Sequence, residues 1–185
     1  MRRFSLTKSC LVAIFGEQPG AGLEVRSVKN QETIAMRFRP TWGYIDGIRQ
    51  FCGQFCTTAG PDEDFAERVQ LVVQELLENA VKYSNERFAA DVEFELSLAQ
   101  NGPDFTIAAM NHGTAEMVEI LQQEIATMTA MDPQQAYNFA LRRAVRSGNK
   151  TNRLGIARMR CDGQVELSAT TTHDGRVRVQ ARGTR

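Results

Sequence analysis

Two side chains one helical turn apart, Glu75 and Asn79, have the types and spacing that could carry out chemistry. A carboxylate and a carboxamide four residues apart lie on the same side of a helix, and Lys82 follows three residues later. Oxygen atoms of this kind suit Mg²⁺, which prefers hard ligands and keeps several of its waters. The same residues would also fit a row of solvated charges beside a core stripe. Their surroundings must therefore decide between a ligand site and an ordinary surface.

The helix that would hold these side chains covers residues 65–83. At about 100° per residue, its apolar residues gather on one broad face. They are Phe65, Val69, Val72, Val73, Leu76, Ala80 and Tyr83. Asp62 or the acidic residues after it can cap the start of the helix. The sequence thus predicts a well-buried helix with a polar seam along the edge of its buried side, formed by Arg68, Glu75, Asn79 and Lys82.

The composition is ordinary for a soluble protein with one core. The 185 residues are 42% hydrophobic and 24% charged, which favours a single domain over residues 1–185. The 22 basic and 22 acidic residues balance, so we expect no general nucleic-acid binding, although a local basic patch is compatible with this balance. No apolar run approaches a membrane span and the start lacks the pattern of a signal peptide. We therefore expect a cytoplasmic protein without a membrane partner.

Two of the four cysteines, Cys52 and Cys56, lie one helical turn apart within an apolar pattern. Zinc would need a second pair of ligands at suitable spacing, and His112 and His173 are isolated in the sequence. We interpret Cys52 and Cys56 as small core residues, in a reducing compartment.

The first half of the chain predicts strands followed by one helix. Residues 9–15 form a plausible first strand, and residues 23–28 and 33–38 alternate as the two strands of a hairpin. Residues 1–29 would thus be an N-terminal strand extension of the domain. A helix opens at Pro40 and carries apolar residues at helical spacing to Phe55.

The second half begins with a hairpin of residues 91–98 and 105–110. Its first strand has one apolar face, made of Val92, Phe94, Leu96 and Leu98. We expect Asn111, His112 and Gly113 to end the second strand sharply.

The remaining elements are expected as two helices, a basic loop, a short helix and a hairpin. Their predicted ranges are 114–128, 133–145, 146–153, 154–161, and 165–171 with 176–181. This order of elements predicts an α+β fold, a two-layer sandwich of a mostly antiparallel mixed sheet with helices on one face.

Residues 75–83, with the sequence ELLENAVKY, resemble the N-box of the GHKL ATPase superfamily. This superfamily includes gyrase-type ATPases, histidine-kinase catalytic domains and anti-sigma-factor serine kinases, and the resemblance covers roughly residues 30–182. It implies the histidine-kinase-like ATPase fold and a site for ATP with Mg²⁺. Asn79 would hold the Mg²⁺ at the phosphates, and Glu75 would orient or deprotonate the attacking hydroxyl or water. Lys82 would approach the phosphates and Tyr83 would pack near the nucleotide.

The family's Asp-x-Gly-x-Gly turn is altered in this chain. Asn111 replaces the aspartate that accepts from the adenine amino group, and Ala115 replaces the second glycine. An asparagine carbonyl can accept the same hydrogen bond without the charge. Gly113 is retained and would let the backbone approach the base.

The glycine-rich lid of the family is also sparse here, within a helical insertion and lid over residues 114–153. Gly148 and Gly155 flank a basic stretch in which Lys150 and Arg153 would add charge near the phosphates. The backbone N–H groups at Gly155, where the next helix starts, would suit a phosphate. A disordered basic loop explains the same residues equally well.

The resemblance implies an ATP-binding regulatory protein similar to the anti-sigma-factor serine/threonine kinases of bacterial signalling. Such a protein phosphorylates or sequesters a small antagonist protein or sigma factor, and the family suggests a homodimer. An alternative is a degenerate interaction module that no longer uses ATP. Its contact surface would be residues 114–145, with Met117, Met128 and Met131 as adaptable apolar contacts, although these methionines suit an ordinary core equally well. An ATP hydrolase of the gyrase or chaperone type ranks last, because it needs further domains.

Overall fold

The computed structural model describes residues 21–28, 30–59, 62–83, 91–99, 104–146 and 154–184. The expected strand at 9–15 lies outside these residues, as do the turn at 100–103 and most of the loop at 146–153. The first elements are β1 (Gly22–Val28), β2 (Gln31–Phe38), η1 (Trp42–Tyr44), α2 (Ile45–Ala59) and α3 (Glu63–Lys82). They are followed by β3 (Val92–Ala99), β4 (Asp104–His112), α4 (Ala115–Thr129), α5 (Pro133–Arg146), α6 (Leu154–Cys161), β5 (Val165–Thr171) and β6 (Arg176–Thr184). This order agrees with the one predicted from the sequence.

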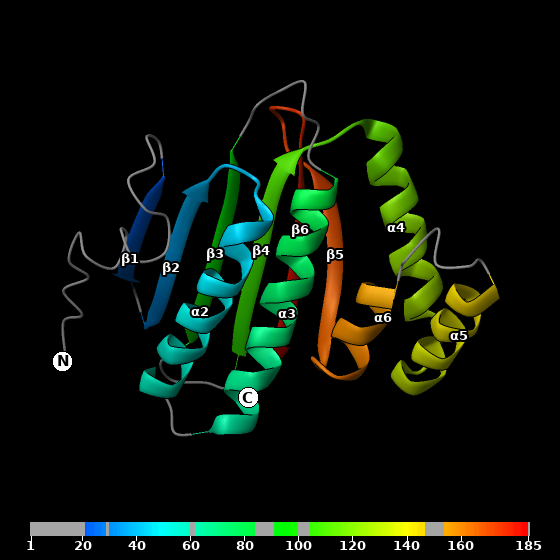
Figure 1. Cartoon of the computed structure of the whole chain (residues 1–185), viewed down its shortest axis with the longest axis horizontal. Helices are drawn as coiled ribbons and strands as arrows, with labels where there is room; N and C mark the ends of the chain where they lie inside the picture. The colour runs from blue at the N-terminus through cyan, green and yellow to red at the C-terminus, as the bar shows by residue number, and fades with distance from the viewer. Residues whose placement is uncertain are drawn as a thin grey trace.

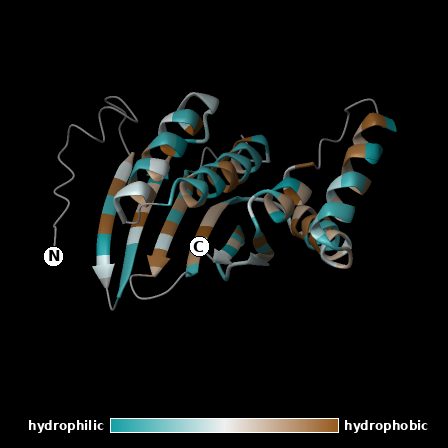
Figure 2. Cartoon of the chain, turned by 90° about the horizontal axis from the view of Figure 1, so that it is seen from below, coloured by the Kyte–Doolittle hydropathy of each residue, from teal (hydrophilic) through white to brown (hydrophobic). Residues whose placement is uncertain are grey.

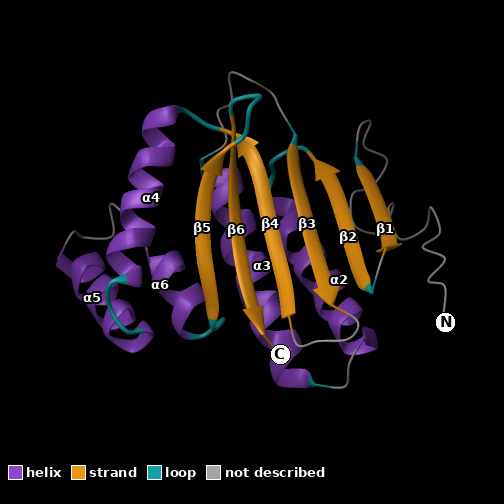
Figure 3. Cartoon of the chain, turned by 180° about the vertical axis from the view of Figure 1, so that it is seen from behind, coloured by secondary structure: helices purple, strands orange, loops and turns teal. Residues whose placement is uncertain are grey.

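The strands form one sheet in the order β1-β2-β3-β4-β6-β5. Every pairing among the described strands is antiparallel, so the parallel component of the expected mixed sheet is not found in this part of the chain. Helices α2 and α3 lie across one face of the sheet, while α4 and α5 lie beyond its β5 edge (Figure 1). Figure 2 shows the sheet and helices as two layers, and Figure 3 shows the other face without a described helix over it. The predicted α+β sandwich is confirmed.

The central helix α3 begins after the N-cap residue Asp62 and ends at the C-cap residue Tyr83. The Asp62 carboxylate accepts from the backbone N–H of Phe65 at 3.2 Å, and acidic residues fill the first turn, where they complement the helix dipole. Its buried residues are Phe65, Ala66, Val69, Val72, Val73, Leu76, Leu77 and Ala80. The prediction that Tyr83 lies on this buried face is wrong, because the helix ends at Tyr83 and the residue is 42% exposed.

Strand β4 extends further than the sequence suggested. Asn111 and His112 were expected to end the strand, but they continue it and pair with Val177 and Arg176 of β6. Strand β6 itself runs three residues past the predicted end at 181, to Thr184. Both extensions have one cause, since two neighbouring strands satisfy each other's backbone groups for as long as they stay in register.

The core lies between the sheet and helices α2 and α3. The predicted β3 face is buried, with Val92, Phe94, Leu96 and Leu98 at most 2% exposed. Cys52 and Cys56 on α2 are fully buried in the same core, as predicted. Among the described residues, no helix has both the length and the apolar character needed to cross a bilayer.

Helices α4, α5 and α6 form a separate group beside β5. Thr114 caps α4 by accepting from the backbone N–H of Met117, and Asp132 does the same for Gln135 at the start of α5. Helix α4 packs along β5 and α5 packs on α6. This group brings the start of α6 close to the polar seam of α3, since α3 and α6 are in contact.

Candidate functional site

A pocket of about 270 Å³ lies among α3, β4, α4, α6 and the β5–β6 hairpin. Its volume is near the lower end of the roughly 300–1,000 Å³ typical of small-molecule sites. Most of the wall is apolar, with Leu76, Ile125, Ile156, Leu167 and Val179 among the lining side chains. The polar lining residues are Asn79, Tyr83, Asn111 and Glu124. An apolar pocket with a few polar groups is the usual form of a ligand site.

Asn111 lines the pocket, is buried and has its side-chain amide oriented by a hydrogen bond. Its side-chain Nδ2 donates to the backbone carbonyl of Ala80 at 3.2 Å. Because a carbonyl only accepts, the amide nitrogen must face Ala80. The Asn111 oxygen is therefore the atom able to accept a hydrogen bond from a ligand in the pocket.

Gly113 lies just beyond Asn111 and also lines the pocket. A Cβ at this position would lie 2.5 Å from Cγ2 of Val177 on β6, a distance that side chains do not tolerate. Close packing of the chain against β6 therefore explains this glycine, in addition to the approach to a ligand expected from the sequence.

The first turn of α6 lies against Glu75 and Asn79 of the α3 seam. A Cβ built on Gly155 would lie 2.6 Å from Oε2 of Glu75 and 3.7 Å from Nδ2 of Asn79. Asn79 and Gly155 both line the pocket, whereas Glu75 lies behind Gly155 rather than in the lining. The structure thus brings the side chains of Glu75 and Asn79 and the backbone of Gly155 together.

The Glu75 carboxylate is mostly enclosed, with 14% of its side chain exposed. Burial raises the pKa of Glu75, the Arg158 guanidinium lowers it, and the neighbouring Glu78 carboxylate raises it further. The Arg158 contact joins Nη1 to Oε1 of Glu75 at 3.0 Å. The net effect is a raised pKa, which makes Glu75 a better proton acceptor than an ordinary surface glutamate.

The other predicted site residues are less closely gathered. Lys82 is exposed, and its Nζ lies 5.3 Å from the centre of the Tyr83 ring. Tyr83 lines the pocket, but Lys82 is not one of the lining residues. Lys150 and Arg153 fall outside the described residues.

Two residues of the site were not predicted from the sequence. Arg158 lies three residues after Gly155 on α6, so the helical spacing could have indicated that both face α3. Glu124 lines the pocket, is only 5% exposed and forms an ion pair with Arg143 of α5. No local pattern indicated this pair, because its partners lie on different helices.

This arrangement can hold a mostly apolar group that donates a hydrogen bond to Asn111. Asn79 offers a hard oxygen ligand of the kind Mg²⁺ accepts. Glu75 offers a carboxylate able to receive a proton, and Gly155 in the first turn of α6 lies beside both residues. The residues present therefore fit a magnesium nucleotide.

Comparisons with known proteins agree with the fold. No curated protein sequence matches this chain. A chain in the crystal structure of the SiaB-SiaC complex from Pseudomonas aeruginosa has 16% sequence identity and a TM-score of 0.61. The match covers 82% of this chain and 89% of that one, and at this identity it shows a shared fold alone.

The family profile described as the histidine kinase-like ATPase domain matches residues 38–160, about two thirds of the sequence. The matched region extends from the end of β2 to α6 and includes Glu75, Asn79, Asn111 and Gly155. This chain therefore belongs to the histidine kinase-like ATPase domain family.

Proposed function

We propose that this chain binds Mg-ATP between α3 and α6 and transfers the γ-phosphoryl group to a hydroxyl group of a small protein partner. The observation that carries the proposal is that Glu75, Asn79 and Gly155 lie together where α6 meets α3, with Asn79 and Gly155 in the lining of the apolar pocket. In this role the chain is a regulatory serine/threonine kinase.

Adenine would occupy the apolar part of the pocket. Its amino group would donate to the oxygen of Asn111, whose nitrogen is already engaged by Ala80. A neutral amide gives a weaker contact than a carboxylate, so the surrounding apolar wall must supply more of the affinity. Tyr83 would cover part of the nucleotide at the pocket mouth.

The phosphates would extend toward α6. Asn79 would ligate Mg²⁺ through its side-chain oxygen, with the phosphates and waters as the other ligands. The N–H groups at Gly155, together with Lys150 and Arg153, would contribute positive potential. ATP supplies a phosphoryl group whose transfer depends mainly on positioning and on neutralising charge.

Glu75 would act as the catalytic base. Its carboxylate would accept the proton of the attacking hydroxyl as the oxygen of that hydroxyl bonds to phosphorus and ADP departs. A buried glutamate with a raised pKa suits this task, because it takes up a proton more readily near neutral pH. The fold shared with a chain of the SiaB-SiaC complex supports a protein as the partner of this chain.

A thermal-shift titration with Mg-ATP tests this proposal. Ligand at 100 times its dissociation constant should stabilise the fold by roughly 2.7 kcal/mol. We expect Asn79→Ala to remove most of the shift and Glu75→Ala to keep it while phosphate transfer is lost. Absence of any thermal shift at millimolar Mg-ATP would refute the proposal that this chain is a kinase. A shift that survives Asn79→Ala would refute the assignment of Asn79.

A second candidate is an interaction module of the same fold that does not use ATP. It is favoured by the exposed apolar side chains of α5, Phe139, Leu141 and Val145, the last of them 75% exposed. A partner could dock on this surface without any nucleotide. In this case Mg-ATP would give no thermal shift, so the same titration separates the two candidates.

A further inference from the structure

One face of α6 contacts Glu75 at two points. Gly155 lies against Oε2, where an added Cβ would approach to 2.6 Å. One turn later, Arg158 donates from Nη1 to Oε1 at 3.0 Å. The two oxygens of the carboxylate are thus contacted by different residues of the same helix face.

These contacts restrict a side chain that otherwise has three rotatable bonds. The Arg158 guanidinium forms a charge-assisted hydrogen bond with the Glu75 carboxylate, which is stronger than a hydrogen bond between neutral groups. On the other side, Gly155 lies so close that an added Cβ would come within 2.6 Å of Oε2. Helix α6 therefore bounds the Glu75 carboxylate at both of its oxygens.

We propose that Arg158 is a positioning residue that orients the Glu75 carboxylate for proton transfer. The inference rests on the proposed function, because it assigns a role to Arg158 only where Glu75 is the base. Arg158 acts through Glu75 and makes no contact with the nucleotide in this role. It is not a residue of the pocket lining, whereas Asn79 and Gly155 are.

The competing contact of Arg158 is weaker. Its Nε lies 3.7 Å from Oδ2 of Asp162, at salt-bridge distance but beyond hydrogen-bond distance, and both side chains are more than 40% exposed. Glu75 is far less exposed than Asp162, so its pair with Arg158 is less screened by water. The Nε of Arg158 therefore faces the Asp162 carboxylate, while Nη1 donates to Glu75.

The test uses Arg158→Gln, Arg158→Lys, Glu75→Gln and the double variant Arg158→Gln/Glu75→Gln. Arg68→Gln is the matched control, since Arg68 lies on α3 and donates to Gln164, away from the pocket. For each chain, release of phosphate from radiolabelled Mg-ATP into water gives kcat, and a thermal-shift titration gives the dissociation constant of Mg-ATP.

We expect Arg158→Gln to lower kcat by between about 10-fold and 100-fold, the range caused by misplacing a reacting group by about 1 Å. The dissociation constant should change by less than about threefold, because Arg158 does not contact the nucleotide. Lysine should restore part of the rate, and Arg68→Gln should match the wild type. In the Glu75→Gln background, Arg158→Gln should cause no further loss, since a residue that acts through Glu75 has nothing left to position.

Other outcomes would overturn the inference. Losses from Arg158→Gln and Glu75→Gln that multiply in the double variant would show that Arg158 acts independently of Glu75. A dissociation constant that rises as much as kcat falls would show that Arg158 binds the nucleotide. An unchanged kcat in Arg158→Gln would show that Arg158 does not orient Glu75 for proton transfer. A wild-type chain that gives no thermal shift with Mg-ATP would instead refute the proposed function. A wild-type chain that gives the shift but releases no more phosphate than Glu75→Gln would refute Glu75 as the base, and this inference with it.

Discussion

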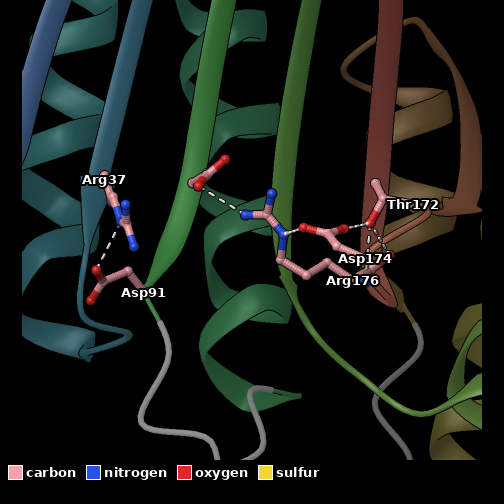
Figure 4. A network of polar contacts seen from close by, with 6 residues as sticks. Arg37, Asp91, Thr172, Asp174 and Arg176 are labelled. Atoms are coloured by element: carbon pink, nitrogen blue, oxygen red, sulfur yellow. Dashed lines mark hydrogen bonds and ion pairs between the residues drawn. The ribbon is translucent and has the colours of Figure 1, made fainter.

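Arginine–carboxylate contacts occur in two regions of this molecule with opposite consequences. On the open face of the sheet, Arg176 bridges Glu93 at 2.8 Å and Asp174 at 2.7 Å, and Thr172 donates to the same Asp174 (Figure 4). Beside the pocket, Arg158 pairs with Glu75 at 3.0 Å. The residue types and distances are similar in the two places.

The pKa of the carboxyl group differs between the two regions. The hydrogen bond from Thr172, helped by Arg176, lowers the pKa of the exposed Asp174 to about 2. Burial outweighs Arg158 at Glu75 and raises the pKa of its carboxyl group. The cluster on the open face thus keeps its carboxylate charged, whereas the pocket keeps a carboxylate ready to accept a proton. Desolvation, and not the presence of an arginine, therefore decides whether the pKa of a carboxyl group lies above or below its ordinary value in these two regions.

The largest expected effect comes from filling the space beside Glu75. Gly155→Ala would place a methyl group 2.6 Å from Oε2 and push the carboxylate away from its position. We expect kcat for phosphate release to fall at least about tenfold, as for other misplaced reacting groups. The free energy of unfolding should stay constant or rise by up to about 1 kcal/mol, because alanine favours a helix more than glycine.

Gly43→Ala is the control for this change, since a Cβ there would have no atom within 4 Å. It should leave kcat unchanged. A Gly155→Ala chain with the wild-type kcat would show that the position of Glu75 does not limit the reaction.

We expect an intermediate effect, on the free energy of unfolding, when Glu93 or Glu75 is replaced by the uncharged glutamine. Glu93→Gln should lower the free energy of unfolding by about 0.5 kcal/mol, since its pair with Arg176 is partly exposed. Glu75→Gln should leave stability unchanged or raise it at neutral pH. A raised folded-state pKa means that ionised Glu75 opposes folding at neutral pH, and this penalty fades as pH falls through the folded pKa. Urea unfolding at pH 7 measures both changes, and equal losses would contradict the comparison.

The smallest effect should follow from Thr172→Ala. Without its hydrogen bond, the pKa of Asp174 should rise from about 2 toward its ordinary value near 3.8. A lowered pKa stabilises the fold above the ordinary value, and this contribution is lost as pH falls through the folded pKa. The variant should therefore lose less stability than the wild type on acidification. Carboxyl NMR titration of Asp174 gives the pKa directly, and a value still near 2 would assign the shift to Arg176.

Features with local causes could be predicted from the sequence. The seam of α3 follows from helical spacing, its start follows from Asp62, and the buried face of β3 follows from alternation. The starts of α4 and α5 follow from Thr114 and Asp132 in the same way. Each of these features depends only on residues a few positions apart in the chain, so the sequence alone is enough to predict it.

Features that depend on distant residues could not be predicted in this way. Arg158 meets Glu75 across 83 positions of the chain, and Asn111 meets Ala80 across 31. The extension of β4 through Asn111 depends on its register with β6. The pairing of Glu124 with Arg143 depends on how α4 and α5 pack. Each is decided by tertiary packing, which local propensity does not determine.

The strand order has a consequence for how the pocket is assembled. Strand β6 lies between β4 and β5, so among the described strands β5 joins the sheet only through β6. Leu167 of β5 and both Val177 and Val179 of β6 line the pocket. These walls are therefore in place only once β6 has paired with β4, a contact between distant parts of the chain whose closure costs entropy. Before β6 enters the sheet, the seam of α3 faces no complete pocket.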